Sequence, residues 1–190
     1  MNPISPRHQL LLGLFLTALM AATRGQHFAV ISAPDASFAV FFLAGVWLSP
    51  AWAFPALFGV SALIDAVAIG WGGVSSACIT PAYALLVPAY GALWAAGRWY
   101  RAHHRLAWST LAPLVSAAAV GGTLAEVFST GGYYLFSGAF AAPTLGGLIA
   151  DVLNYLPATL THLAFYLGLA AVAYLAFALT PGRGQGAAVR

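Results

Sequence analysis

The residues best suited to chemistry in this sequence are one cysteine and four carboxylates. Cys78 is the only cysteine, and the acids are Asp35, Asp65, Glu126 and Asp151. A thiolate is a soft ligand that suits cobalt, copper or iron centres better than calcium or magnesium. One thiolate cannot hold a bare ion, but it can supply one axial bond to a metal already held by a macrocycle. A carboxylate inside an apolar segment is expensive and indicates a functional site.

These residues stand in a chain that is too apolar for water. Of the 190 residues, 62% are hydrophobic and 6% are charged, whereas about 25% are charged in soluble domains. This composition excludes a soluble enzyme, a disordered chain and a nucleic-acid binder, because a net charge of +3 cannot track phosphates. A single cysteine excludes an internal disulfide and a CxxC motif. The phosphate-loop pattern GxxxxGK[ST] is missing, so we expect no ATP site in this chain.

Six apolar segments are long enough to cross a bilayer, which takes about 20 residues of helix. They do not alternate in polarity as barrel strands would. Pro157 is expected to divide the last apolar stretch, with residues 145–155 as a helical extension of the sixth span. The sequence therefore predicts an all-α, six-transmembrane-helix bundle, a single domain over residues 1–180 followed by a tail over 181–190. The expected spans are 9–23, 37–49, 51–69, 78–97, 109–128 and 156–180.

The arginines orient this bundle, because cytoplasmic loops carry an excess of positive charge. With a cytoplasmic N-terminus, only Arg24 lies on the outer side, and RWYRAHHR (98–105) is a cytoplasmic loop. Both termini and the tail are then cytoplasmic. The arginines on the inner side are Arg7, Arg98, Arg101, Arg105, Arg183 and Arg190.

On this topology the acids and Cys78 all lie toward the outer side. Asp65 stands about one turn inside the third span, where its alternative role is an ion pair with Arg24. Glu126 and Asp151 could instead be interfacial carboxylates in water. The glycine-rich connection 128–147 is expected to be a loop able to fold over a pocket. It carries Tyr133 and Tyr134, which fit either a lid or an aromatic belt.

The surroundings of Cys78 leave several roles open. The residue opens the fourth span, where the positive end of the helix dipole favours thiolate, and GGVSSACITP leaves room for a bulky ligand. A lone cysteine in a membrane helix is most often a small packing residue. A nucleophilic or redox role needs a nearby base, and His27 is the only outer-face histidine. His162, deeper in the sixth span, is expected to pack rather than to ligate.

The segment VSSACITPAY, the intramembrane Asp65 in the preceding span and the loop carrying His27 resemble the BtuM family of cobalamin transport proteins. That family is a relative of the S-components of energy-coupling factor (ECF) transporters, which the six spans and the length also resemble. The resemblance implies that Cys78 is the axial ligand to the cobalt of cobalamin, the transported ligand. It implies uptake across a bacterial inner membrane, with no enzymatic activity beyond ligand exchange at the bound cobalt.

Further roles follow from the same resemblance. The spacing of Ala18 and Ala22 allows close helix approach, and the resemblance implies docking there on a transmembrane coupling protein with its ATPases. Aromatic faces and a few polar groups would surround the corrin. The residues expected to bind it are His27, Asp65, Tyr83, Tyr133, Tyr134, Asp151 and Asn154.

Three other functions remain open at this point. An S-component for another vitamin or a metal ion would bind no corrin and would not depend on Cys78. A membrane enzyme that uses Cys78 as a nucleophile or redox thiol would show turnover in the isolated chain. A subunit that only packs in a larger complex is disfavoured, because it has no need for acids gathered at one level.

Overall fold

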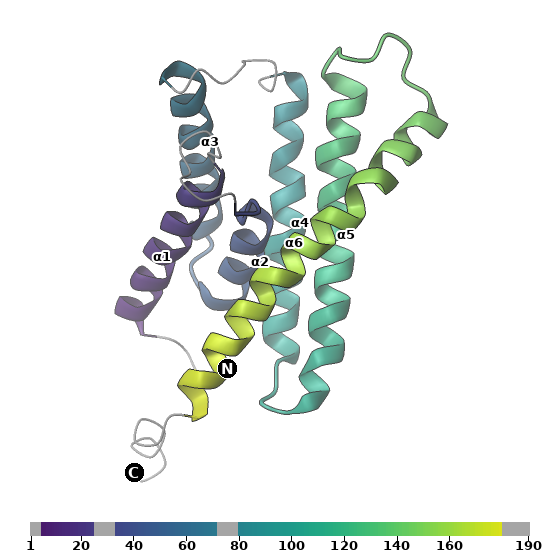
Figure 1. The fold of residues 1–190 in the computed structure, drawn as a ribbon. Helices are drawn as coiled ribbons and strands as arrows, with labels where there is room; N and C mark the ends of the chain where they lie inside the picture. Colours follow the sequence, from purple (N-terminus) through teal and green to yellow (C-terminus); the bar gives the residue numbers. More distant parts are fainter. Residues whose placement is uncertain (1–4, 25–32, 72–79, 180–190) are drawn as a thin grey trace.

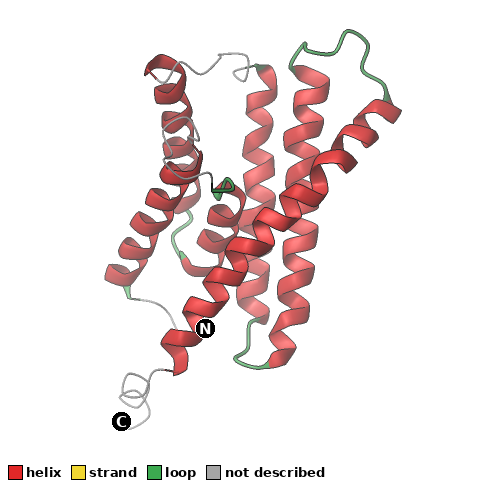
Figure 2. Ribbon diagram, in the orientation of Figure 1, coloured by secondary structure: helices red, strands yellow, loops and turns green. Residues whose placement is uncertain are grey.

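The computed structural model describes residues 5–24, 33–71 and 80–179, and within these ranges the chain is helical without strands (Figures 1 and 2). Cys78 and His27 lie outside the described residues. The elements are α1 (Pro6–Arg24), α2 (Ser37–Trp47), α3 (Ala53–Trp71), the 3₁₀ turn η2 (Pro81–Leu85), α4 (Leu86–His103), the 3₁₀ turn η3 (Trp108–Thr110), α5 (Leu111–Phe136) and α6 (Leu145–Leu179).

Three helical segments of the described chain are long and apolar enough to cross a membrane: Ala53–Trp71, Trp108–Phe136 and Leu145–Phe177. The prediction of an all-helical membrane protein is thus supported, whereas six spans and cytoplasmic termini stay predictions. The 11-residue α2 is too short to cross on its own, because at 1.5 Å per residue it extends for only about 16 Å.

The centre of the bundle is α2. Almost every residue of this helix is buried, and it packs against α1, α3, α4, α5 and α6. Two glycines let α2 and α4 approach closely: a Cβ at Gly45 would strike the Trp94 carbonyl, and a Cβ at Gly97 would strike that of Phe42. Small residues at such crossings allow the backbones to touch. Around this core, α4 packs on α5 and α6 runs obliquely across α2 and α5 (Figure 1).

The two ends of the bundle differ in charge. At the arginine end, which holds Arg7, Arg98, Arg101 and Arg105, α1 and α5 begin and α4 ends. The opposite end is the acid end, where α3 finishes and α6 begins (Figure 1). Asp35, Asp65 and Asp151 lie toward it, and Glu126 lies on the same half of α5.

Two segments predicted as loops, 98–105 and 128–147, are largely helical, while the cytoplasmic location of the first stays a prediction. The α4 helix continues through Arg98 and Arg101 to His103, and cations in a last turn suit the negative end of the helix dipole. The α5 helix continues to Phe136, so the connection to α6 is only residues 137–144. The glycines near the end of α5 allow close packing, because Gly131 faces Leu148 and Gly132 faces Leu85.

The expected division at Pro157 is also wrong, because α6 is one helix of 35 residues with this proline inside it. Proline removes one amide donor, and neighbouring helices and Thr side chains commonly compensate for that in membranes. The missing amide would have donated to the Leu153 carbonyl; the Thr161 hydroxyl makes a different bond one turn later, donating to the Pro157 carbonyl at 2.7 Å. The predicted helical extension over 145–155 is therefore present, but as part of a continuous helix.

Candidate functional site

A partly buried ion pair joins α1 to α3 on the acid half of the bundle. The Arg24 guanidinium donates from Nε to Asp65 Oδ1 and from Nη2 to Asp65 Oδ2, both at 2.7 Å. The two side chains are 9% and 23% exposed. Such a bidentate pair fixes the relative orientation of both groups as well as their charge. The ion pair with Arg24, the alternative role of Asp65, is thus present.

The remaining guanidinium nitrogen binds α2 and α4. Arg24 Nη1 donates to Ser37 Oγ at 3.0 Å and to the Tyr90 hydroxyl at 2.5 Å. The Tyr90 ring stacks on Phe41 with centroids 4.2 Å apart and planes 8° apart. One arginine at the end of α1 therefore anchors four helices, and its place suits a cation at a helix C-terminus.

Two further groups extend this network. The Tyr83 hydroxyl in η2 donates to Asp65 Oδ2 at 2.8 Å. Asp35 Oδ1 accepts from the backbone N–H and the hydroxyl of Ser37 at 2.7 and 2.6 Å. The network of Arg24, Asp35, Ser37, Asp65, Tyr83 and Tyr90 contains one cationic and two acidic side chains. Through its hydrogen bond to Asp65, the Tyr83 phenol is held in this network at the acid end.

Further hydrogen bonds hold the end of α1 and the segment before α2, which carry residues of this network. The Thr23 hydroxyl donates to the Leu19 carbonyl at 2.9 Å and accepts from the Ala36 N–H at 3.1 Å. The Tyr166 hydroxyl of α6 donates to the Pro34 carbonyl at 2.5 Å. These bonds fix the end of α1 and the start of α2 beside each other, which positions Arg24 against Ser37.

Thr80, immediately before η2, carries an unsatisfied polar atom. Its Oγ1 is buried and has no hydrogen-bond partner among the described residues. A buried hydroxyl without a partner is destabilising by about 1–3 kcal/mol, so it calls for an explanation. Thr80 stands two positions after Cys78 and three before Tyr83.

Glu126 forms a separate polar site between α5 and α6. Its side chain accepts hydrogen bonds from the Thr130 hydroxyl and, at 2.6 Å, from the Thr159 hydroxyl. The residue is 3% exposed, so the interpretation of Glu126 as a carboxylate in water is wrong. Asp151, by contrast, is half-buried on the second turn of α6.

The aromatic pair at the end of α5 is divided between two environments. Tyr134 is buried, packs against Phe140 with centroids 4.4 Å apart, and accepts from the Thr144 N–H at 3.2 Å. Tyr133 is exposed. Tyr134 thus ties the 137–144 loop down.

The other predicted site residues lie apart from the Arg24 network. Asn154 is exposed on α6, as is His162. Among the described residues, no hydrogen bond joins Tyr133, Asp151 or Asn154 to that network. Ala18 and Ala22 are exposed one turn apart on α1, away from the bundle. Of the predicted site residues that the structure describes, Asp65 and Tyr83 are brought into direct contact.

The sequence patterns did not indicate Ser37, Tyr90 and Thr159 as polar partners, nor Thr80 as a buried hydroxyl without one. Tyr90 had a readable signal, since a tyrosine buried in an apolar helix needs a partner for its hydroxyl. The hydroxyl of Thr159 lies 33 positions from Glu126. That contact depends on how α5 and α6 are paired, which residue types alone do not specify.

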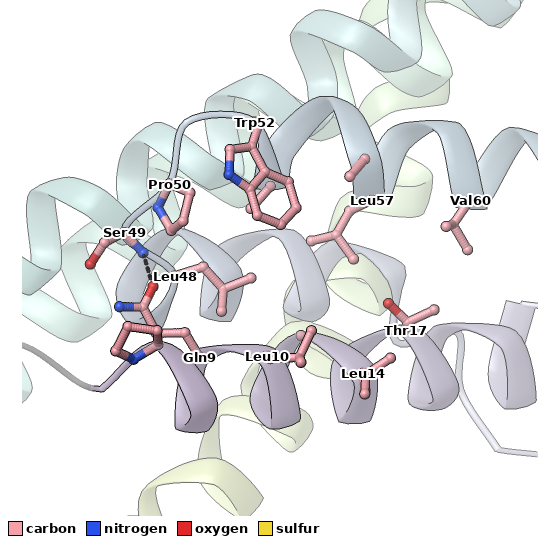
Figure 3. Close-up of a pocket in the computed structure, with 14 residues that line it drawn as sticks. Gln9, Leu10, Leu14, Thr17, Leu48, Ser49, Pro50, Trp52, Leu57 and Val60 are labelled. Atoms are coloured by element: carbon pink, nitrogen blue, oxygen red, sulfur yellow. Dashed lines mark hydrogen bonds between the residues drawn. The ribbon is translucent and has the colours of Figure 1, made fainter.

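Two cavities of the described chain lie at the arginine end. One, of about 380 Å³, runs between α1 and α3 and is shown in Figure 3. The other, of about 490 Å³, lies between α2, the start of α5 and the last turns of α6, with His104 in its wall. The predicted outward-facing pocket would lie at the opposite end and stays a prediction.

The described residues contain no cluster of three or more His, Cys, Asp or Glu side chains able to hold a metal ion. Comparison of the chain with protein-family models and with curated proteins finds no match.

Proposed function

We propose that this protein captures cobalamin at the acid end of the bundle for uptake across a membrane. The single observation that carries the proposal is that two polar groups stand close to Cys78 in the sequence. One is the Tyr83 phenol, held by a hydrogen bond, and the other is the unsatisfied hydroxyl of Thr80. Tyr83 is held by Asp65 at 2.8 Å, and Thr80 Oγ1 is buried without a partner in the described chain. Both stand within five positions of the only thiol.

The chemistry of cobalamin matches these groups. The Cys78 thiolate supplies one axial bond to cobalt, a metal for which soft sulfur is a suitable ligand. The corrin carries amide side chains, which donate to and accept from hydroxyl and carboxylate oxygens. Thr80 and Tyr83 bind such amides, and Asp65 acts by holding Tyr83 and by offering its partly exposed carboxylate. His27, Tyr133, Asp151 and Asn154 are the further groups proposed around the ligand.

In this proposal the bundle crosses the bacterial inner membrane six times with its arginine end in the cytoplasm. The short α2 can serve as a span because its neighbours cover it, and irregular backbone is tolerated at membrane depth where protein buries it. The chain has no phosphate-loop motif, so energy for accumulation comes from a partner. The exposed face of α1 with Ala18 and Ala22 is the proposed docking site for an ECF-type coupling protein with ATPases.

Equilibrium binding of cobalamin to the detergent-purified protein tests this proposal. The wild type is expected to retain one cobalamin per chain. T80V should weaken binding about tenfold, the value of one hydrogen bond of about 1.4 kcal/mol, without lowering thermal stability, because the hydroxyl has no described partner to lose. T161V removes an exposed hydroxyl on α6 and should bind like the wild type. Wild-type protein that retains no cobalamin, or equal affinity in T80V and the wild type, would contradict the proposal.

A further inference from the structure

The cavity between α1 and α3 is an apolar groove that begins at the arginine end. Leu10, Leu14 and Thr17 of α1 face Leu57 and Val60 of α3 across it (Figure 3). Its α1 wall, from Pro6 to Thr17, extends for about 16 Å at 1.5 Å per residue. That length is close to half of the hydrocarbon core of about 30 Å. The groove therefore has the depth of one leaflet.

Two guanidinium groups bind Ser49 at one end of this groove, which we call its mouth. Ser49 lines the groove, and its carbonyl accepts from Arg98 Nη1 and Nη2 at 3.2 and 3.3 Å. Arg101 Nη1 donates to Ser49 Oγ at 3.2 Å. Gln9 Oε1 accepts from the Ser49 N–H at 2.9 Å, which fixes this turn against α1 (Figure 3).

Within the described residues, no acidic side chain pairs with these two charges. Their hydrogen bonds go to neutral oxygens of Leu48 and Ser49, and the salt bridge of the described chain is the one between Arg24 and Asp65. All four acids of the sequence lie on the acid half. The mouth of the groove is thus positively charged, while its walls are apolar. A ligand that fits both parts has an anionic head and an apolar chain.

We propose that the groove binds an anionic phospholipid from the leaflet at the arginine end. One acyl chain lies between α1 and α3, and the phosphate binds Arg98 and Arg101 beside Ser49. Guanidinium groups bind phosphate through strong charge-assisted hydrogen bonds, and basic pockets between membrane helices bind anionic head groups. This site is separate from the proposed cobalamin site at the other end of the bundle and does not depend on it.

Native mass spectrometry of the full chain in detergent tests the proposal with dioleoyl phosphatidylglycerol and dioleoyl phosphatidylcholine. The wild type should retain one phosphatidylglycerol with about tenfold preference over phosphatidylcholine. The double variant R98Q/R101Q should lose that preference. R105Q removes an exposed charge at the same end but outside this groove, and it should keep the preference. Equal retention of both lipids by the wild type, or an unchanged preference in the double variant, overturns the proposal.

A second variant tests the groove itself, because Arg98 also holds the turn at Leu48 and Ser49. Ala56 is exposed and lines the groove, so A56W should fill it without altering the core and should abolish lipid retention. A119W places the same ring on an exposed position of α5 and should retain lipid. If A56W retains phosphatidylglycerol as the wild type does, the acyl chain is not in the groove. If A56W instead blocks only the co-purification of a membrane protein, the occupant is a partner helix; either result overturns the proposal.

Discussion

Neutralising Asp65 should strongly destabilise the fold, because it leaves the Arg24 guanidinium buried without its counter-charge. Loss of one partner from a buried ion pair is destabilising by about 3–5 kcal/mol. In D65N the amide oxygen can still accept from Nε, and the Asp65 side chain is 23% exposed. Arg24 also keeps Ser37 and Tyr90. We therefore expect a loss near the lower limit, about 3 kcal/mol in the free energy of unfolding.

Unfolding by SDS in mixed micelles, followed by near-ultraviolet circular dichroism, measures this loss. Y83F removes only one hydroxyl bond to Asp65 and should lose about 1 kcal/mol. In the double variant R24M/D65N neither member of the ion pair is left as an unpaired charge, so its loss should fall about 2 kcal/mol short of the sum of the two single losses. A loss below about 0.5 kcal/mol in D65N, or additive single losses, would refute the view that the pair holds α1 against α3.

Three further predictions concern other parts of the bundle. Burial lowers the pKa of His104 below its usual 6.5; stability is therefore full above pH 6.5 and falls as the pH drops toward the lowered pKa. Thermal unfolding between about pH 7 and 5 should show this fall in stability in the wild type but not in H104N. The control H103N, which changes an exposed ring, should behave like the wild type. An identical dependence of stability on pH in all three proteins would contradict this prediction. G97A should destabilise the protein by about 3 kcal/mol in the same SDS titration, because its Cβ would strike the Phe42 carbonyl. The control G59A, with open space around it, should not destabilise. A tolerated G97A would show that α2 and α4 are less closely packed. E126L should lose about 2 kcal/mol of unfolding free energy, because it leaves two threonine hydroxyls unpaired. The triple variant E126L/T130V/T159V should recover most of this stability. No recovery would mean that Glu126 stabilises the protein through something other than these two hydroxyls.

Composition was sufficient to predict a helical membrane protein, because so few charges cannot cover a surface in water. The ends of its segments were less predictable. Glycines 131 and 132 read locally as loop residues, yet they lie inside α5 because Leu148 and Leu85 pack against them. Pro157 was expected to end a helix, but α6 continues through it. At the two glycines, tertiary packing outweighs the local preference of the residue.

The candidate site was likewise only partly predictable from the sequence. Charge alone was enough to suggest Arg24 as a partner for Asp65, since a buried carboxylate needs a cation. The contributions of Ser37 and Tyr90 depend on the placement of α2 and α4 around the guanidinium, which is a property of the assembled bundle. The unsatisfied hydroxyl of Thr80 is visible only once burial is known.

The absorption spectrum of cobalamin bound to the purified protein tests the central claim most directly. Coordination of cobalt by the Cys78 thiolate should shift the corrin bands of the bound ligand relative to free cobalamin. C78A should lose this shift, while S76A, a matched change two positions away in the same segment, should keep it. A shifted spectrum that persists unchanged in C78A, or bound cobalamin with the spectrum of the free ligand, would contradict thiolate ligation at this site.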